Sequence, residues 1–218
     1  MFGKPDENLH KMAKENKELI KLWSAFLAGE EAAFSRLFFD YYELLYHYGY
    51  RITPKPEFLK DVLQDFFLNL YESRASLSPD VKNLRAYLIT SFRRRLLLEL
   101  KRQRRTNSTL EDIVDKEDHL FDIGIEDVLI KRESSAQQKQ LVGELLDNLP
   151  PRQREIIYLR YYLDLSLPEI AKTLQISYQV VANHLYRALK KLQGSSTIKR
   201  FFKMDIWLLL SLYPLLGF

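Results

Sequence analysis

Residues 166–192, SLPEIAKTLQISYQVVANHLYRALKKL, predict two short helices joined by a tight turn. Ser166 can cap the first helix, and Glu169, three residues on, can reach back to the amide of the cap, which is the capping-box pattern. Ser177 is expected to cap a second helix that runs to about Gln193. Together these features predict a helix-turn-helix.

The second of these helices is expected to have one apolar and one polar face. Val181, Leu185, Leu189 and Leu192 recur at helical spacing and should face the core. A helix with polar and basic groups on its outer face fits the major groove of DNA, where amides and guanidinium groups pair with base edges. The candidate contacts on this face are Tyr178, Gln179, Asn183, Tyr186 and Arg187. A small helical bundle without DNA has the same apolar spacing, so that alternative stays open.

The composition predicts an all-α protein without catalytic chemistry. Of 218 residues only 7 are Gly and 8 are Pro, and 46% are hydrophobic, which favours helices and is enough to form cores. Cysteine is absent and the four His residues have no ligand spacing, so we expect no disulfide and no metal site. We find no nucleophile–base pair and no glycine-rich phosphate loop. The chain is therefore not expected to be an enzyme or to need a cofactor, and a cytoplasmic location is expected because no signal peptide is apparent.

Charge is segregated along the chain, although the formal net charge is only +4. Residues 82–105 carry nine Lys or Arg against the single acid Glu99. Residues 106–133 carry nine acids against three basic residues. The first of these segments is expected to bind phosphate groups and the second is not.

Composition and breaks divide the chain into five parts. These are an N-terminal extension (1–18), a helical domain (19–105), an acidic linker (106–133), a second helical domain (134–194) and a hydrophobic C-terminal tail (195–218). The tail ends in IWLLLSLYPLLGF, whose thirteen residues are too few for a membrane span, which needs about 20. We expect the tail to dock on this chain; docking on a partner or on a membrane surface remains open.

The order of sequence blocks resembles the bacterial sigma factors of the extracytoplasmic-function (ECF) group, sigma-70 family, which keep only sigma regions 2 and 4. The resemblance spans roughly residues 22–192. The blocks that carry it are GEEAAF at 29–34, DVLQDFFLNLY at 61–71, NLRAYL at 83–88, LPPRQRE at 149–155 and the segment from Leu165 to Ala171. The resemblance implies a two-domain helical fold and a subunit that directs core RNA polymerase to promoters.

The resemblance also implies roles for particular residues. Region 2 of the family docks on the clamp helices of the largest polymerase subunit, which assigns polymerase binding to Asp61, Gln64 and Asp65. The loop and basic helix that follow open the minus 10 element and hold it as a single strand, which assigns that element to Ser76, Lys82, Asn83, Arg85, Arg93, Arg94 and Arg95. Region 4 of the family reads the minus 35 element and grips a flap on the second polymerase subunit. Family members are commonly restrained by a membrane-bound anti-sigma factor.

Several positions depart from the family pattern. The family usually has Trp where Tyr87 stands, Asn where Arg94 stands, Asp where Leu98 stands and Gly where Gln175 stands. The leading hypothesis is a sigma factor that acts as a monomer on asymmetric promoter sites. The alternative is a stand-alone helix-turn-helix regulator that binds symmetric duplex DNA as a dimer.

Overall fold

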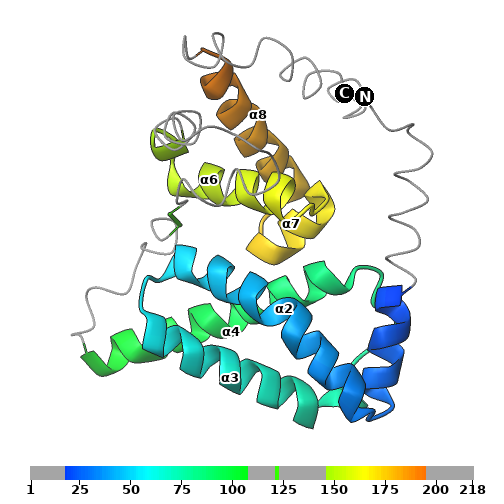
Figure 1. The fold of residues 1–218 in the computed structure, drawn as a ribbon. Coiled ribbons are helices and arrows are strands. Elements are labelled where there is room, and N and C mark those ends of the chain that lie inside the picture. Colours follow the sequence, from blue (N-terminus) through cyan, green and yellow to red (C-terminus); the bar gives the residue numbers. More distant parts are fainter. Residues whose placement is uncertain (1–17, 108–120, 123–145, 195–218) are drawn as a thin grey trace, which may run out of the picture. The chain divides into compact units, whose positions relative to one another are not determined.

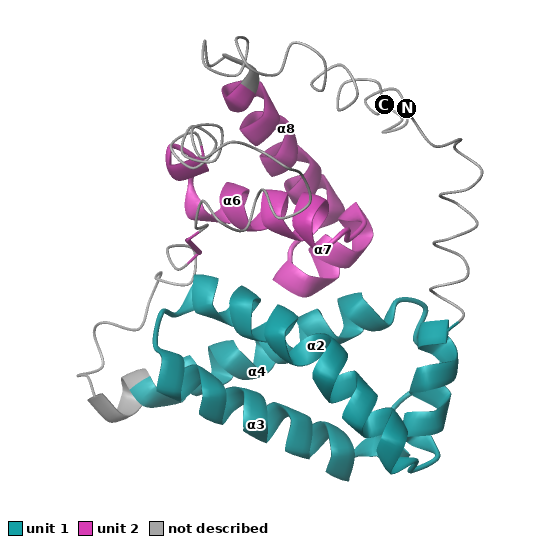
Figure 2. Cartoon of the chain, in the orientation of Figure 1, with its two compact units in different colours: residues 1–114 teal, residues 115–218 magenta. Residues whose placement is uncertain are grey.

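The computed structural model describes residues 18–107, 121–122 and 146–194. All secondary-structure elements within these ranges are helical, as the composition predicted. The chain divides into two compact units, Met1–Val114 and Asp115–Phe218 (Figure 2). The predicted N-terminal extension, the hydrophobic tail and most of the acidic linker lie outside the described residues.

The first unit is a bundle of helices (Figure 1). Its elements are a helix at residues 18–27, α2 (Glu31–Ile52), α3 (Pro56–Glu72), the short 3-10 helix η1 (Arg74–Ser76) and α4 (Leu84–Asn107). The helices α2, α3 and α4 pack against one another. The apolar side chains that recur every four residues along α3 are buried in this packing: Val62, Phe66 and Leu70.

Local sequence explains where these helices begin and end. Gly29 adopts a left-handed φ of +92°, which lets the chain turn from the first helix into α2. Pro56 stands at the first turn of α3, where the missing amide proton costs nothing. α4 begins at Leu84, because the Asn83 side chain caps the helix by accepting a hydrogen bond from the Ala86 amide at 3.1 Å.

Gly49 lies where α2 comes close to α3 and α4. It is buried on α2, and a Cβ atom at this position would lie 2.5 Å from Leu59 Cδ1 of α3. The same Cβ would lie 3.1 Å from the Phe92 ring of α4. A glycine therefore lets α2 come close to both neighbouring helices at one point.

The second unit is a smaller helical domain. Its elements are α6 (Pro151–Ile157), the π-helical turn η5 (Tyr158–Tyr162), α7 (Leu167–Leu174) and α8 (Tyr178–Gly194). The α-helix α6 ends at Ile157, where the backbone widens into η5. The Leu163 amide bonds to the Tyr158 carbonyl at 3.1 Å, five residues back, and Asp164 then takes a left-handed φ of +55° that ends the segment.

Two residues of the predicted acidic linker pack in the second unit. Phe121 is 4% exposed, and its ring lies 5.5 Å from that of Tyr158, centroid to centroid. The neighbouring Asp122 accepts a hydrogen bond from Arg154 at 3.0 Å. This part of the linker is therefore tied to the helix that supports the helix-turn-helix.

Candidate nucleic-acid and protein interfaces

The outer face of α3 carries the three residues predicted to bind a protein partner. Asp61, Gln64 and Asp65 are exposed, whereas Val62 and Phe66 between them are buried. A helix turns 100° per residue, so positions three and four apart share one face. Two carboxylates and an amide on one exposed stripe suit basic side chains of a partner.

Leu68 extends this stripe and was missed by the sequence reasoning. It lies seven residues after Asp61, on the same face, and is 51% exposed. Single exposed apolar residues are common on protein surfaces, so the exposure of Leu68 does not by itself assign a contact to it. The helical period of α3 was the signal that could have identified it.

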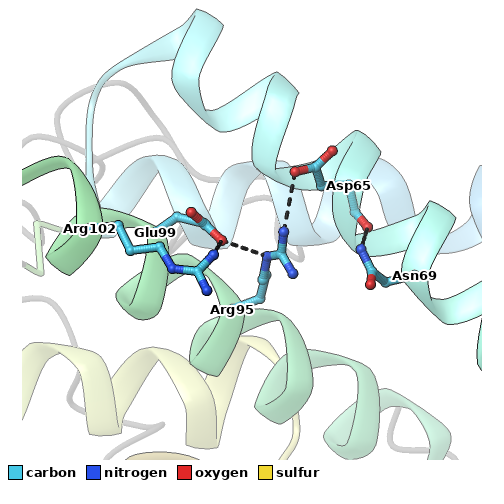
Figure 3. A network of polar contacts seen from close by, with 5 residues as sticks. All are labelled: Asp65, Asn69, Arg95, Glu99 and Arg102. Carbon is cyan, nitrogen blue, oxygen red and sulfur yellow. Dashed lines mark hydrogen bonds and ion pairs between the residues drawn. The ribbon is translucent and has the colours of Figure 1, made fainter.

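Asp65 and Arg95, predicted to bind different partners, bind each other (Figure 3). Arg95 on α4 donates from Nη2 to Asp65 Oδ2 at 3.2 Å. Arg95 Nε also lies 3.0 Å from Glu99 Oε1, and the same oxygen accepts a hydrogen bond from Arg102 Nη1 at 2.9 Å. Figure 3 further shows the Asn69 side chain bonded to the Asp65 backbone carbonyl, at 2.7 Å. The seam between α3 and α4 thus holds a polar network.

The three consecutive arginines of α4 have different surroundings. Arg93 is 7% exposed, Arg94 is exposed and Arg95 is engaged with Asp65 and Glu99. Successive side chains on a helix point in different directions, and a run of identical letters does not reveal which of them faces the core. Burial of Arg93 argues against its predicted contact with DNA.

The loop from η1 to α4 holds the remaining predicted minus 10 residues. Ser76 and Lys82 are exposed, and the Ser76 hydroxyl donates to the Ser73 carbonyl at 2.8 Å. Asn83 and Arg85 are half-buried. Burial raises the pKa of Tyr41, and the positive charge of nearby Arg85 opposes that shift. Of the predicted groups in this region, Ser76 and Lys82 are therefore the more open to a partner.

Trp23 anchors this loop, a role that sequence reasoning did not find. Its side chain is 1% exposed, and its indole Nε1 donates to the Ser78 carbonyl at 3.0 Å. Its ring also lies 5.3 Å from that of Tyr87 on α4, centroid to centroid. The helix at 18–27 thus holds the loop and α4 together through one aromatic residue.

The helix-turn-helix forms as predicted. The Ser166 amide donates to Glu169 Oε2 at 2.7 Å, which completes the predicted capping box of α7. The Ser177 hydroxyl accepts from the Val180 amide at 3.3 Å and caps α8. Between the helices Gln175 adopts a left-handed φ of +56°, which gives the physical reason why glycine suits this turn.

The two faces of α8 also match the prediction. Val181 and Leu185 are buried, and Leu189 and Leu192 are half-buried. All five predicted minus 35 residues are exposed: Tyr178, Gln179, Asn183, Tyr186 and Arg187. Val180 joins them at 39% exposure, although its apolar character had not suggested a surface role.

Polar contacts stiffen this outer face and its support. The Gln179 amide donates to the Asn183 carbonyl oxygen at 3.5 Å, one turn away. Behind the helices, Arg152 of α6 pairs with the buried Glu155 at 3.2 Å and donates to the Leu174 carbonyl at the end of α7 at 3.5 Å. The helix-turn-helix is therefore held by α6 as well as by its own caps.

Within the described ranges we find neither a metal cluster nor a membrane-spanning helix. No group of three or more His, Asp or Glu side chains there is placed to hold a metal ion. No described helix is both long and apolar enough to cross a bilayer.

Comparisons with known proteins match both units. Residues 37–106 match the family model described as sigma-70 region 2, and residues 139–192 match sigma-70 region 4. The chain is 28% identical over 153 residues to the ECF RNA polymerase sigma factor SigK of Mycolicibacterium vanbaalenii, covering 66% of this chain and 73% of that protein.

Two solved structures share the fold. One is CnrH in complex with the cytosolic domain of CnrY, with a TM-score of 0.51 and 20% identity, over 80% of this chain and 94% of that one. The other is the sigma factor RpoE in complex with the anti-sigma factor NepR from Bartonella quintana, with a TM-score of 0.50 and 18% identity, over 76% and 96% of the two chains.

A region 2 helical unit followed by a region 4 helix-turn-helix unit defines a promoter-specificity subunit of bacterial RNA polymerase rather than an enzyme. The chain belongs to the ECF group of the sigma-70 family and directs RNA polymerase to promoters. Membership in this family implies core RNA polymerase as its partner. The hypothesis of a sigma factor is thereby confirmed, and the stand-alone regulator is not supported.

Proposed function

We propose that the outer face of α3 docks on the clamp helices of the largest polymerase subunit through Asp61, Gln64 and Asp65. The support is their shared exposure on a helix whose opposite face is buried. Carboxylates at this spacing can each accept two hydrogen bonds from an arginine of the partner. Leu68 adds apolar area at the edge of the same patch.

The loop before α4 and the first turns of α4 hold the minus 10 element as a single strand. Flipped bases need hydrogen-bonding groups, and the strand needs positive charge to offset its phosphates. The residues proposed for this role are Ser76, Lys82, Asn83, Arg85, Arg94 and Arg95. Arg93 is left out because it is buried.

The outer face of α8 reads the minus 35 element in the major groove. Gln179 and Asn183 can pair with base edges, and their side chains lie within 3.5 Å of each other on the same exposed face. Tyr178, Tyr186 and Arg187 flank them and can contact phosphates. Because the two promoter elements differ, the chain acts as a monomer on an asymmetric site.

Two further partners belong to this proposal. The second unit grips the flap of the second polymerase subunit, as region 4 does in the family. An anti-sigma factor restrains the chain in the cytoplasm and is bound to the membrane, as is common in the family. In support, two structural relatives were solved in complexes, one with the cytosolic domain of CnrY and one with the anti-sigma factor NepR.

The exposed stripe on α3 is the observation that carries the docking proposal, and it can be tested directly. Purified chain is mixed with core polymerase and the complex is quantified, beside the double variant Asp61→Ala/Asp65→Ala. The control is Glu57→Ala/Glu72→Ala, which removes the same charge from exposed positions of the same helix. The proposal expects loss of binding only for the first variant. Equal binding by both variants would overturn the assignment of this face.

A further inference from the structure

Asp65 has two roles that compete with each other. It belongs to the face proposed to dock on polymerase, and in the chain alone it binds Arg95, which belongs to the proposed DNA-binding set. The Asp65 side chain is 58% exposed, so a partner can reach it, whereas that of Arg95 is only 27% exposed. The ion pair therefore links the two surfaces across the seam of α3 and α4.

An incoming guanidinium group must compete with Arg95 for the same carboxylate. Fork-like pairing of an arginine with a carboxylate uses both oxygens, and one of them, Oδ2, already accepts from Arg95. Once displaced, Arg95 keeps only Glu99 within this network, and Glu99 is shared with Arg102. Arg95 and Arg102 then both contact Glu99 Oε1, and the charge of Arg95 is no longer offset by Asp65.

We propose that the Asp65–Arg95 pair is a latch that couples polymerase docking to promoter binding. This inference rests on the proposed docking through Asp65. In the free chain the latch weakens the binding of polymerase at Asp65 and of DNA at Arg95, because each of the two side chains neutralises the charge of the other. Docking on polymerase engages Asp65 and releases Arg95 toward the phosphates of the minus 10 strand. By thermodynamic linkage the two binding events then strengthen each other.

The size of the effect follows from the exposure of the pair. A partly exposed ion pair of this kind is expected to change a binding constant by about two- to fivefold. Removing Arg95 should therefore tighten binding to core polymerase by that factor, although it removes a basic residue. A purely structural role for Arg95 predicts the opposite sign, since loss of a packing contact can only weaken docking.

The first experiment measures the affinity of labelled chain for core polymerase by fluorescence anisotropy. The variant is Arg95→Gln and its matched control is Arg94→Gln, which removes the same charge from the exposed neighbouring position of α4. We expect tighter binding for Arg95→Gln alone, and we expect the gain to vanish when Asp65→Asn is also present. Equal effects of the two variants, or a gain that persists with Asp65→Asn, would overturn the latch.

The second experiment reads the other side of the latch without polymerase. The free chain is titrated with a fluorescein-labelled single-stranded oligonucleotide, comparing Asp65→Asn with Asp61→Asn, an exposed acid one turn away. Asp65→Asn should increase the affinity of the free chain for the oligonucleotide about two- to fivefold more than Asp61→Asn does. The reason is that Asp65→Asn releases Arg95, whereas Asp61→Asn does not. Equal increases would refute the inference. Failure of the wild-type chain to bind core polymerase at all would instead refute the proposed docking. Thermal unfolding followed by circular dichroism excludes variants that are misfolded.

Discussion

Gly49→Ala tests whether the close approach of three helices fixes the first unit. The added Cβ would stand 2.5 Å from Leu59 Cδ1 and 3.1 Å from Phe92 Cε1, and both of these side chains are 0% exposed. Neither neighbour can move into solvent, so the helices must separate or the side chains must leave their preferred rotamers. Overpacking of this kind costs about 1–3 kcal/mol.

A helix-interior glycine also has a cost that alanine removes. That gain is about 0.5–1 kcal/mol, so the net loss in the free energy of unfolding should be about 1 kcal/mol at the centre of the two ranges and at most about 2.5 kcal/mol. For a domain of this size such a loss lowers the melting temperature by roughly 5–15 °C. Gly49→Ala should therefore destabilise the protein even though alanine is the better helix former.

Chemical denaturation followed by circular dichroism measures this change. Ser35→Ala is the control, because it introduces alanine at an exposed position of the same helix. Leu59→Val, combined with Gly49→Ala, should recover part of the loss, since a shorter side chain makes room for the new methyl group. An unchanged or raised melting temperature for Gly49→Ala would refute the packing argument, as would strictly additive effects in the double variant.

Three further predictions concern single contacts. Gln175→Gly should stabilise the second unit by about 1 kcal/mol, because it relieves the left-handed backbone in the turn; a lower melting temperature would contradict this. Ser166→Ala removes the cap of α7 and should lower the free energy of unfolding by about 0.5–2 kcal/mol, which urea unfolding measures. No measurable change would mean that the second unit does not need the capping box. Trp23→Phe removes the donor to the Ser78 carbonyl and should cost about 1 kcal/mol. In holoenzyme it should weaken binding to minus 10 single strands more than to minus 35 duplex, and equal weakening would argue against a role in positioning the loop.

The helix-turn-helix was predictable because its determinants are local. The capping box needs residues three positions apart, the Ser177 cap needs the next turn, and the apolar stripe of α8 repeats every three or four residues. Each of these signals is complete within the segment from 166 to 192. The structure accordingly places all five predicted residues of α8 on its exposed face.

The features that sequence reasoning missed depend on contacts between distant segments. Trp23 and Ser78 are 55 residues apart, and Asp65 and Arg95 are 30 apart. Their pairing follows from how the helices pack, which no local period encodes. Arg93 shows the same limit, because its burial is decided by the helices around α4 and not by the charge of its neighbours.

In vitro transcription measures whether this chain gives RNA polymerase its promoter specificity. Core polymerase is supplied with the purified chain and with promoter fragments selected from genomic DNA. We expect transcripts with defined start sites that require the chain and are lost with Asp61→Ala/Asp65→Ala. The same transcripts without the chain, or no specific transcript with it across the selected fragments, would show that the chain does not direct promoter recognition.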